Sequence, residues 1–186
     1  MSKIKSYEEY IEKARRTFPD LGKETNEVHM MSGMFTEKAE IIDVLKKKIA
    51  YGKDIDMVNI KEEVGDFMWY FANADYFMRQ NEGFFRYAKY IRERIEKPND
   101  LIPRPPVVKF TKDILKIEFG SFINQFSLLT AADFIIEVCS FFELDLIECM
   151  NLNYQKLLKR YPKGFDPDKA INRDLDVERN TLENNK

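Results

Sequence analysis

Apolar residues recur every three or four positions over most of the chain, which is the spacing of helices with one buried face. Between residues 25 and 50 the apolar positions are four or seven apart, at Met30, Met34, Ile41, Leu45 and Ile49. The whole pattern predicts helices over about residues 6–18, 25–50, 57–80, 84–96, 109–118, 121–142 and 146–160.

Residues typical of helix ends stand at the predicted boundaries. Ser6 with Glu9 forms a capping-box pattern, and Asp56 and Asp145 precede two further helices. Their side chains can accept hydrogen bonds from the first backbone N–H groups. Gly52 follows the second helix and can adopt the left-handed conformation that ends it.

Proline and polar residues divide the helical stretches. Residues 98–106 hold four of the seven prolines and predict a connector. Pro162 and Gly164 end the last firm helix, and the polar C-terminal tail from Asp174 is expected to fray. With no internal repeat, the sequence predicts one all-α domain over residues 1–186, a helix bundle.

Composition narrows the fold and the chemistry. The 186 residues include 7 Gly and 7 Pro, too few for the tight turns of a β-sandwich or barrel. The 30 basic and 32 acidic residues give a net charge of −2, which argues against a protein that coats a nucleic-acid polymer. One His and two Cys exclude a Cys/His zinc module, so carboxylates remain for chemistry.

The most apolar region, residues 131–150, is not expected to span a membrane. It contains five acidic residues, Asp133, Glu137, Glu143, Asp145 and Glu148. The N-terminus lacks the uninterrupted apolar core of a secretory signal. The default expectation is a cytoplasmic protein with reduced cysteines.

Two pairs of acidic residues stand out on successive predicted helices. Glu37 and Glu40 are three residues apart, as are Glu63 and Asp66, so each pair lies on one side of its helix. If the helices pack as an antiparallel hairpin, four carboxylates converge, and a divalent cation would relieve their repulsion. All-oxygen ligands suit Mg²⁺ or Mn²⁺, which assist phosphoryl hydrolysis.

The alternative is that both pairs are solvated helix faces. Apolar neighbours favour partial burial instead: Phe35, Ile41, Val64, Phe67 and Trp69. A di-iron bundle would need Glu-x-x-His motifs, and His29 belongs to none.

Residues 29–72 resemble the all-α nucleoside triphosphate pyrophosphohydrolases, the MazG-like family. That family carries an E-x-x-E pair followed by an E-x-x-D pair, here at the four acids above, with YGK at 51–53 between them and GDFMWY at 65–70. Thr36 stands where many members have a further Glu. The resemblance implies hydrolysis of an NTP or dNTP to the monophosphate and pyrophosphate, with Mg²⁺ held by the four carboxylates. It places such enzymes in bacterial or phage nucleotide metabolism.

Residues 151–174 resemble the C-terminal segment of the same branch, an Asn-x-x-Lys helix that runs into Arg-Tyr-Pro. Asn153, Lys156 and Arg160 form one helical stripe, which could contact the triphosphate. The alternative is a basic helix end favoured by the helix dipole, with Arg160 exposed.

Further residues have two interpretations each. Lys47 and Lys53 could reach a phosphate, although Lys47 also suits an ordinary pair with Asp43. Glu62 points away from Glu63 and is expected as a peripheral base or as a group that supports a ligand, not as a ligand itself. Either Glu62 or one of the four carboxylates could orient or deprotonate the attacking water. Asn73 could contact a base or sugar, or be a buried hydrogen-bonded amide. Trp69 and Tyr70 are expected in the core, and the alternative is a platform on which a base stacks. His29 is expected in a helix contact.

The aromatic-rich patch of Phe84, Phe85, Tyr87, Tyr90, Phe141 and Phe142 predicts core or subunit interface. Because one small bundle has limited inner volume, we expect a homodimer or homotetramer. Two other functions stay open: a regulatory module that binds metal and nucleotide without turnover, and a structural helical interaction protein.

Overall fold

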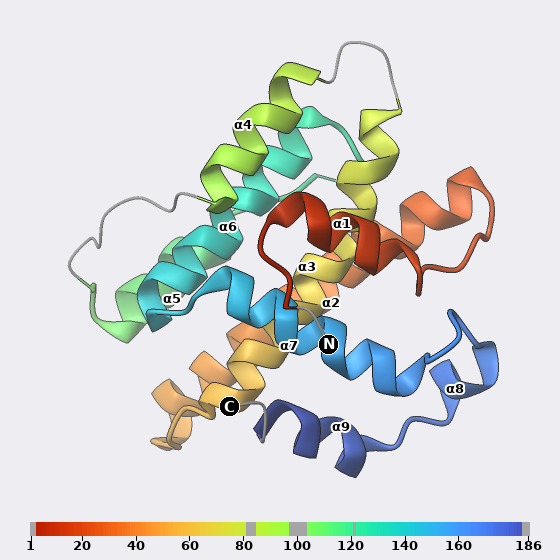
Figure 1. Cartoon of the computed structure of the whole chain (residues 1–186). Helices are drawn as coiled ribbons and strands as arrows, with labels where there is room; N and C mark the ends of the chain where they lie inside the picture. Colours follow the sequence, from red (N-terminus) through yellow and green to blue (C-terminus); the bar gives the residue numbers. More distant parts are fainter. Residues whose placement is uncertain (1–2, 81–84, 97–103, 121, 184–186) are drawn as a thin grey trace.

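The computed structural model describes residues 3–80, 85–96, 104–120 and 122–183, and these residues contain nine helices and no strand (Figure 1). The helices are α1 (Tyr7–Arg15), α2 (Lys23–Tyr51), α3 (Met57–Arg79), α4 (Phe85–Glu96), α5 (Val107–Leu115), α6 (Gln125–Phe142), α7 (Leu146–Arg160), α8 (Pro167–Ile171) and α9 (Leu175–Glu183). The expected all-α fold is confirmed.

Local capping chemistry sets several helix boundaries as predicted. The side chains of Ser6, Asp56 and Asp145 accept hydrogen bonds from backbone N–H groups in the first turns of α1, α3 and α7. Gly52 ends α2 in the left-handed conformation, with φ of 66°. Glu9 differs from a full capping box, because its carboxylate accepts from the N–H of Lys5.

Helix α3 runs through the centre of the molecule. It pairs with α2 in the expected antiparallel hairpin, and α1, α6 and α7 pack around its other sides (Figure 1). Phe67, Met68 and Phe71 of α3 are fully buried, as are Ile41 and Leu45 of α2. This burial on several sides explains why α3 shows apolar residues around most of its circumference.

Two glycines inside helices allow α3 to approach its neighbours closely. A Cβ atom on Gly33 of α2 would lie 2.2 Å from ring carbons of Tyr70. A Cβ atom on Gly65 of α3 would lie 2.9 Å from Cβ of Asn153 and 3.0 Å from the carbonyl oxygen of Cys149 in α7. Glycine costs helix stability, so its presence here marks contacts for which only a hydrogen fits.

Helix α6 is the one described helix that is long and apolar enough, by length and composition, to cross a membrane. Half of this 18-residue helix is nevertheless buried inside the protein, where it packs on α3, α4 and α5. Phe134 and Ile135 are fully buried among other apolar side chains. These contacts make the buried side of α6 part of the core.

The C-terminal segment differs from the expectation. Residues 175–183 form α9 and pack on α7 instead of fraying. Thr181, Leu182 and Glu178 are buried, so α9 has an inner face despite its polar composition. Of the predicted connector, only residues 104–106 lie within the described part of the chain, and the last three residues of the predicted tail lie outside it.

The aromatic patch is only partly described. Phe84 and the side chains of Phe85 and Tyr87 lie outside the described residues. Tyr90 is half exposed, whereas Phe142 is buried and packs edge-on against Phe141. Phe141 also stacks on Phe110 of α5 with ring centroids 3.9 Å apart. Phe142 thus belongs to the core, and the partly buried Phe141 packs against it.

Candidate functional site

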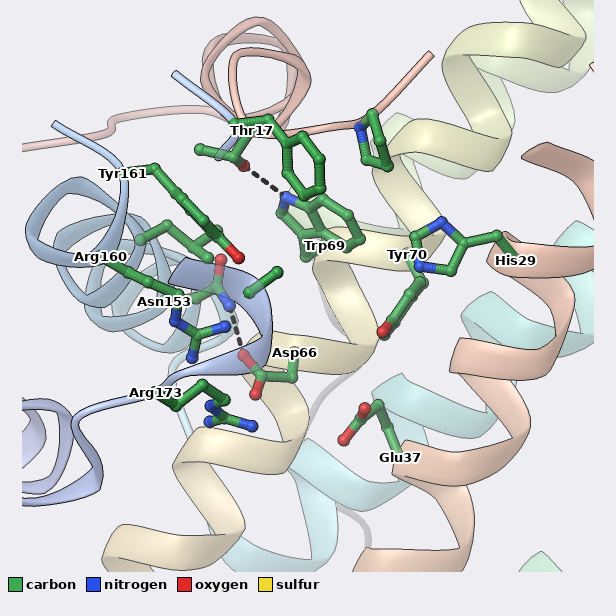
Figure 2. A pocket seen from close by; sticks show the side chains of 14 residues that line it. Thr17, His29, Glu37, Asp66, Trp69, Tyr70, Asn153, Arg160, Tyr161 and Arg173 are labelled. Carbon is green, nitrogen blue, oxygen red and sulfur yellow. Dashed lines mark hydrogen bonds between the residues drawn. The ribbon is translucent and has the colours of Figure 1, made fainter. Parts of the chain in front are cut away.

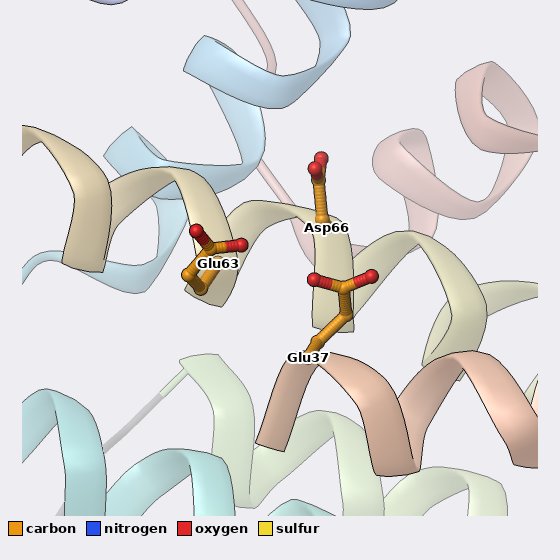
Figure 3. A group of neighbouring side chains, drawn as sticks. All are labelled: Glu37, Glu63 and Asp66. Atoms are coloured by element: carbon orange, nitrogen blue, oxygen red, sulfur yellow. The ribbon is translucent and has the colours of Figure 1, made fainter. Parts of the chain in front are cut away.

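Three carboxylates converge where α2 faces α3. Glu37, Glu63 and Asp66 each offer an oxygen atom, and these atoms all lie within 4.8 Å of one another (Figure 3). Glu37 extends from α2 toward α3, which carries the other two (Figure 3). Within the described ranges, this is the one group of three or more His, Cys, Asp or Glu side chains close enough to share a metal ion. We refer to it as the acidic cluster.

Burial and mutual repulsion raise the pKa values of two cluster members. Burial, followed by the charges of Asp66 and Glu63, raises the pKa of Glu37 to about 9. Burial, with Glu40 and Asp66, raises the pKa of Glu63 to about 7. Only 7% of Glu63 is exposed, and its Oε1 accepts a hydrogen bond of 2.5 Å from the amide of Asn59. Crowding of the acids therefore makes Glu37 and Glu63 retain protons, and a cation bound among the carboxylates would take the place of those protons.

The structure brings three of the four expected carboxylates together and leaves Glu40 beside them. Its side chain is exposed, and it lies outside the group of three. It is still near enough to raise the pKa values of Glu37 and Glu63. Helix geometry explains the difference, because α2 turns through about 300° between residues 37 and 40 and carries Glu40 past the contact with α3.

Lys156 of α7 enters the site from the opposite side of α3. Its ammonium group lies 2.7 and 2.6 Å from the two carboxylate oxygens of Asp66 and 3.0 Å from Oε1 of Glu62. The side chain is 1% exposed. Although burial opposes its charged form, Asp66 and Glu62 keep its pKa above the ordinary value. Lys156 is thus a buried counter-ion of the acids, and Glu62 pairs with it at the edge of the cluster.

A short chain of hydrogen bonds fixes Asp66 further. The side-chain amide of Asn153 donates to Oδ1 of Asp66 at 2.6 Å (Figure 2). The amide oxygen of Asn153 accepts from the hydroxyl of Tyr10 at 2.8 Å, and that hydroxyl also contacts the carbonyl oxygen of Gly65. Because both ends of the Asn153 amide are engaged, its orientation is set, and so is the donor that Asp66 receives.

A cavity of about 240 Å³ opens beside Glu37 and Asp66 (Figure 2). Aromatic side chains form much of its wall, namely Trp69, Tyr70, Tyr161 and Phe165. His29 also lines it and packs edge-on against Trp69 and Tyr70. Trp69 is held in place by hydrogen bonds to the hydroxyl of Thr17 and the carbonyl oxygen of Ala14. The cavity thus joins apolar rings to the carboxylates.

Two arginines complete the wall opposite Glu37. Arg160 ends α7 and Arg173 lies just before α9, and both line the cavity (Figure 2). Each donates hydrogen bonds to the carboxylate of Glu178 in α9. Arg160 therefore lies at the cavity, where it could contact a substrate, and it is paired and mostly buried instead of exposed.

Three other candidate residues lie away from this arrangement. Lys47 pairs with Asp43 at 2.5 Å, as its spacing allowed, and Lys53 is exposed. Neither lies among the described residues that line the cavity. Asn73 is fully buried and donates to the carbonyl oxygen of Trp69 at 2.8 Å, which fits the structural alternative. Thr36 donates to the carbonyl oxygen of Gly33 at 2.9 Å.

The sequence analysis missed several residues of the site. Glu178 stood in the tail expected to fray, and Arg173 lay within residues 151–174 but was given no role of its own. Tyr10 lay on a predicted amphipathic helix with no motif, and Asn59 on the helix that carries Glu63. Only Asn59 had a local signal, because an amide four residues before Glu63 shares its helix face.

The acidic cluster fits a hard divalent cation. All its donors are oxygen atoms, and a bound cation would take the place of the protons that burial makes Glu37 and Glu63 retain. Opposite ligands of Mg²⁺ lie at most about 4.2 Å apart, so atoms within 4.8 Å would need only small side-chain movements.

No protein-family model, curated protein or solved structure matches the chain.

Proposed function

We propose that the protein is a Mg²⁺-dependent nucleoside triphosphate pyrophosphohydrolase. The observation that carries this proposal is the convergence of Glu37, Glu63 and Asp66 within 4.8 Å at the edge of a cavity with aromatic and arginine walls. A nucleotide presents an aromatic base and a chain of phosphates, and these three surfaces match its ring, its anionic groups and the metal ion that accompanies them.

Different residues would bind the metal ion, orient the attacking water and neutralise the phosphates. The acidic cluster holds the ion, which when bound neutralises phosphate charge and lowers the pKa of a coordinated water. Glu40 lies beside the cluster without belonging to it and is free to orient the attacking water. Arg160 lies opposite Glu37 and would neutralise charge that spreads over the phosphates in the transition state. Lys156 keeps Asp66 in place.

The cavity favours one ring system over a whole nucleotide. Its volume of about 240 Å³ lies just below the usual range of about 300–1,000 Å³ for small-molecule sites. The base would occupy the aromatic end, between Trp69 and Tyr161, and the phosphates would extend along the carboxylates toward Arg160. Mn²⁺ could replace Mg²⁺, because the same oxygen ligands suit both ions. We propose a cytoplasmic role in nucleotide-pool control.

The test is pyrophosphate release from a panel of NTPs and dNTPs, with and without Mg²⁺, and with identification of both products. We expect a monophosphate and pyrophosphate from at least one nucleotide, and no release in EDTA. Glu63→Gln should abolish turnover, whereas Glu183→Gln, an exposed acid of α9 outside the cavity, should not. Tight nucleotide binding without release would identify a regulatory module instead. If no nucleotide binds, the protein would instead be a structural helical interaction protein.

A further inference from the structure

The C-terminal segment places two cations side by side at the cavity. Arg160 donates from Nε and Nη2 to the two carboxylate oxygens of Glu178, at 2.6 and 2.5 Å. Arg173 donates to Oε2 of the same carboxylate from Nη2 at 2.7 Å and from Nε at 3.3 Å. Only 4% of Glu178 is exposed, so one buried carboxylate holds two guanidinium groups.

This trio has an uneven charge. Two guanidinium groups and one carboxylate leave one net positive charge, and both guanidinium groups line the cavity that Glu37 and Asp66 also line (Figure 2). Without Glu178, the two cations would repel each other and their long side chains would be free to move. Glu178 therefore fixes an anion-attracting surface at a defined place beside the acidic cluster.

A neighbouring arginine, Arg179, forms ion pairs that serve only the structure. Arg179, the next residue in α9, donates to Asp56 at 3.0 and 3.3 Å and to Glu183 at 2.6 Å. Those partners balance it with two negative charges, and it does not line the cavity. Arg160 and Arg173 have the opposite arrangement, because they share one acid and face the cavity.

We infer that Arg160 and Arg173 form a seat for a phosphate or pyrophosphate group, and that Glu178 is the positioning residue that holds them there. The inference rests on the proposed function, and it gives Arg173, Glu178 and hence α9 a part in binding the phosphates. Planar guanidinium groups suit this ligand, because each can donate two parallel hydrogen bonds to phosphate oxygens. Hydrogen bonds to charged groups are worth enough that losing one arginine should weaken binding about 10-fold or more.

The experiment titrates inorganic pyrophosphate into the full chain by calorimetry, in EDTA and again with Mg²⁺. Arg173→Gln should raise the Kd about 10-fold or more, and Glu178→Gln should raise it too. Arg179→Gln is the matched control and should change the Kd less than about 2-fold. In nucleotide hydrolysis, Arg173→Gln and Glu178→Gln should raise KM more than they lower kcat, which a merely structural role would not do.

Each outcome decides the inference. An unchanged Kd in Arg173→Gln, or no pyrophosphate binding by the unaltered protein, overturns the seat. Tighter binding in Glu178→Gln would make Glu178 a competitor of the anion and overturn its positioning role. If Glu178→Gln fails to fold, Arg173→Gln alone decides, since Arg173 is partly exposed. Hydrolysis that is insensitive to Arg173 refutes only this inference, whereas pyrophosphate binding through Arg173 without any hydrolysis refutes only the proposed function.

Discussion

Lys156 donates to both carboxylate oxygens of Asp66, one of the three residues of the acidic cluster. The ammonium comes from α7 on one side of α3, and the carboxylate of Glu37 comes from α2 on the other. Asp66 is therefore shared between a cation built into the fold and the cluster that suits an added cation. This sharing links the stability of the protein to the chemistry of its site.

Removal of the ammonium should destabilise the fold strongly. In Lys156→Met, Asp66 and Glu62 lose their buried partner, and breaking a buried pair costs about 3–5 kcal/mol. Urea unfolding should report a loss of this size in the free energy of unfolding. Lys47→Met serves as the control, because Lys47 is half exposed and should change stability by less than about 0.5 kcal/mol. A loss as small as the control's would show that the Asp66 pair contributes little.

The stability of the metal-free protein should fall as the pH rises. The pKa values of Glu37 and Glu63 are about 9 and about 7 in the folded protein, against 4.5 ordinarily. Above pH 4.5 the unfolded chain loses protons that the folded chain keeps, so stability declines until about pH 9. Thermal unfolding in EDTA across this range measures the slope. Glu37→Gln should flatten it, and an equal slope in that variant would contradict the assignment.

Mg²⁺ should stabilise the protein more at high pH than at low pH. The ion competes with the protons that Glu37 and Glu63 hold, so binding must release them at pH 6 but releases fewer at pH 9. We expect the increase in Tm with Mg²⁺ to grow from pH 6 to pH 9. A constant increase would indicate that the ion binds elsewhere.

Glu63 should contribute much more than Glu40 to the affinity for Mg²⁺. Loss of a ligand in Glu63→Gln should weaken Mg²⁺ binding by more than about 100-fold, beyond the usual effect of residues that only support ligands. Glu40→Gln should weaken it less than about 10-fold, since Glu40 is exposed and acts only through its charge. Isothermal titration measures both. If Glu40 orients the water, its variant should still lose kcat. Equal losses of Mg²⁺ affinity in the two variants would show that Glu40 also coordinates the ion.

A methyl group at Gly65 should separate α3 from α7. The new Cβ would lie 2.9 Å from Cβ of Asn153 and 3.0 Å from a backbone oxygen, which cannot move aside easily. We expect Gly65→Ala to cost about 1–3 kcal/mol and to weaken Mg²⁺ binding, because Asn153 would be displaced from Asp66. Ser32→Ala, at an exposed position of α2, is the control for a new methyl group in a helix. Greater stability in Gly65→Ala would contradict the close packing.

Most helix ends could be predicted because their causes are local. Ser6, Asp56 and Asp145 cap helices through hydrogen bonds to residues two or three positions away, and Gly52 stops α2 by its own backbone freedom. Helix α9 could not be predicted in this way. Its polar sequence gains a buried face only when α7 supplies the surface, and Glu178 meets an arginine that lies 18 residues earlier.

Helix spacing predicted which acids of the cluster share one side of a helix, but not how that helix contacts its neighbour. Spacing placed Glu63 and Asp66 on one side of α3. It could not show that Glu37 of α2 meets them while Glu40 lies outside the group. The role of Lys156 was also hidden, because a lysine on a helix surface is normally solvated. Its burial depends on Asp66 and Glu62, which lie about 90 residues earlier in the chain.

That separation along the chain has a consequence for folding order. During synthesis, the hairpin of α2 and α3 emerges long before Lys156, so its acids meet while their buried counter-ion is still missing. Repulsion at Glu37, Glu63 and Asp66 should keep the hairpin loosely packed until α7 joins it, which hydrogen exchange during refolding can follow. Tight packing of the α2–α3 hairpin would then depend on the last third of the chain, although that third supplies no acid to the cluster.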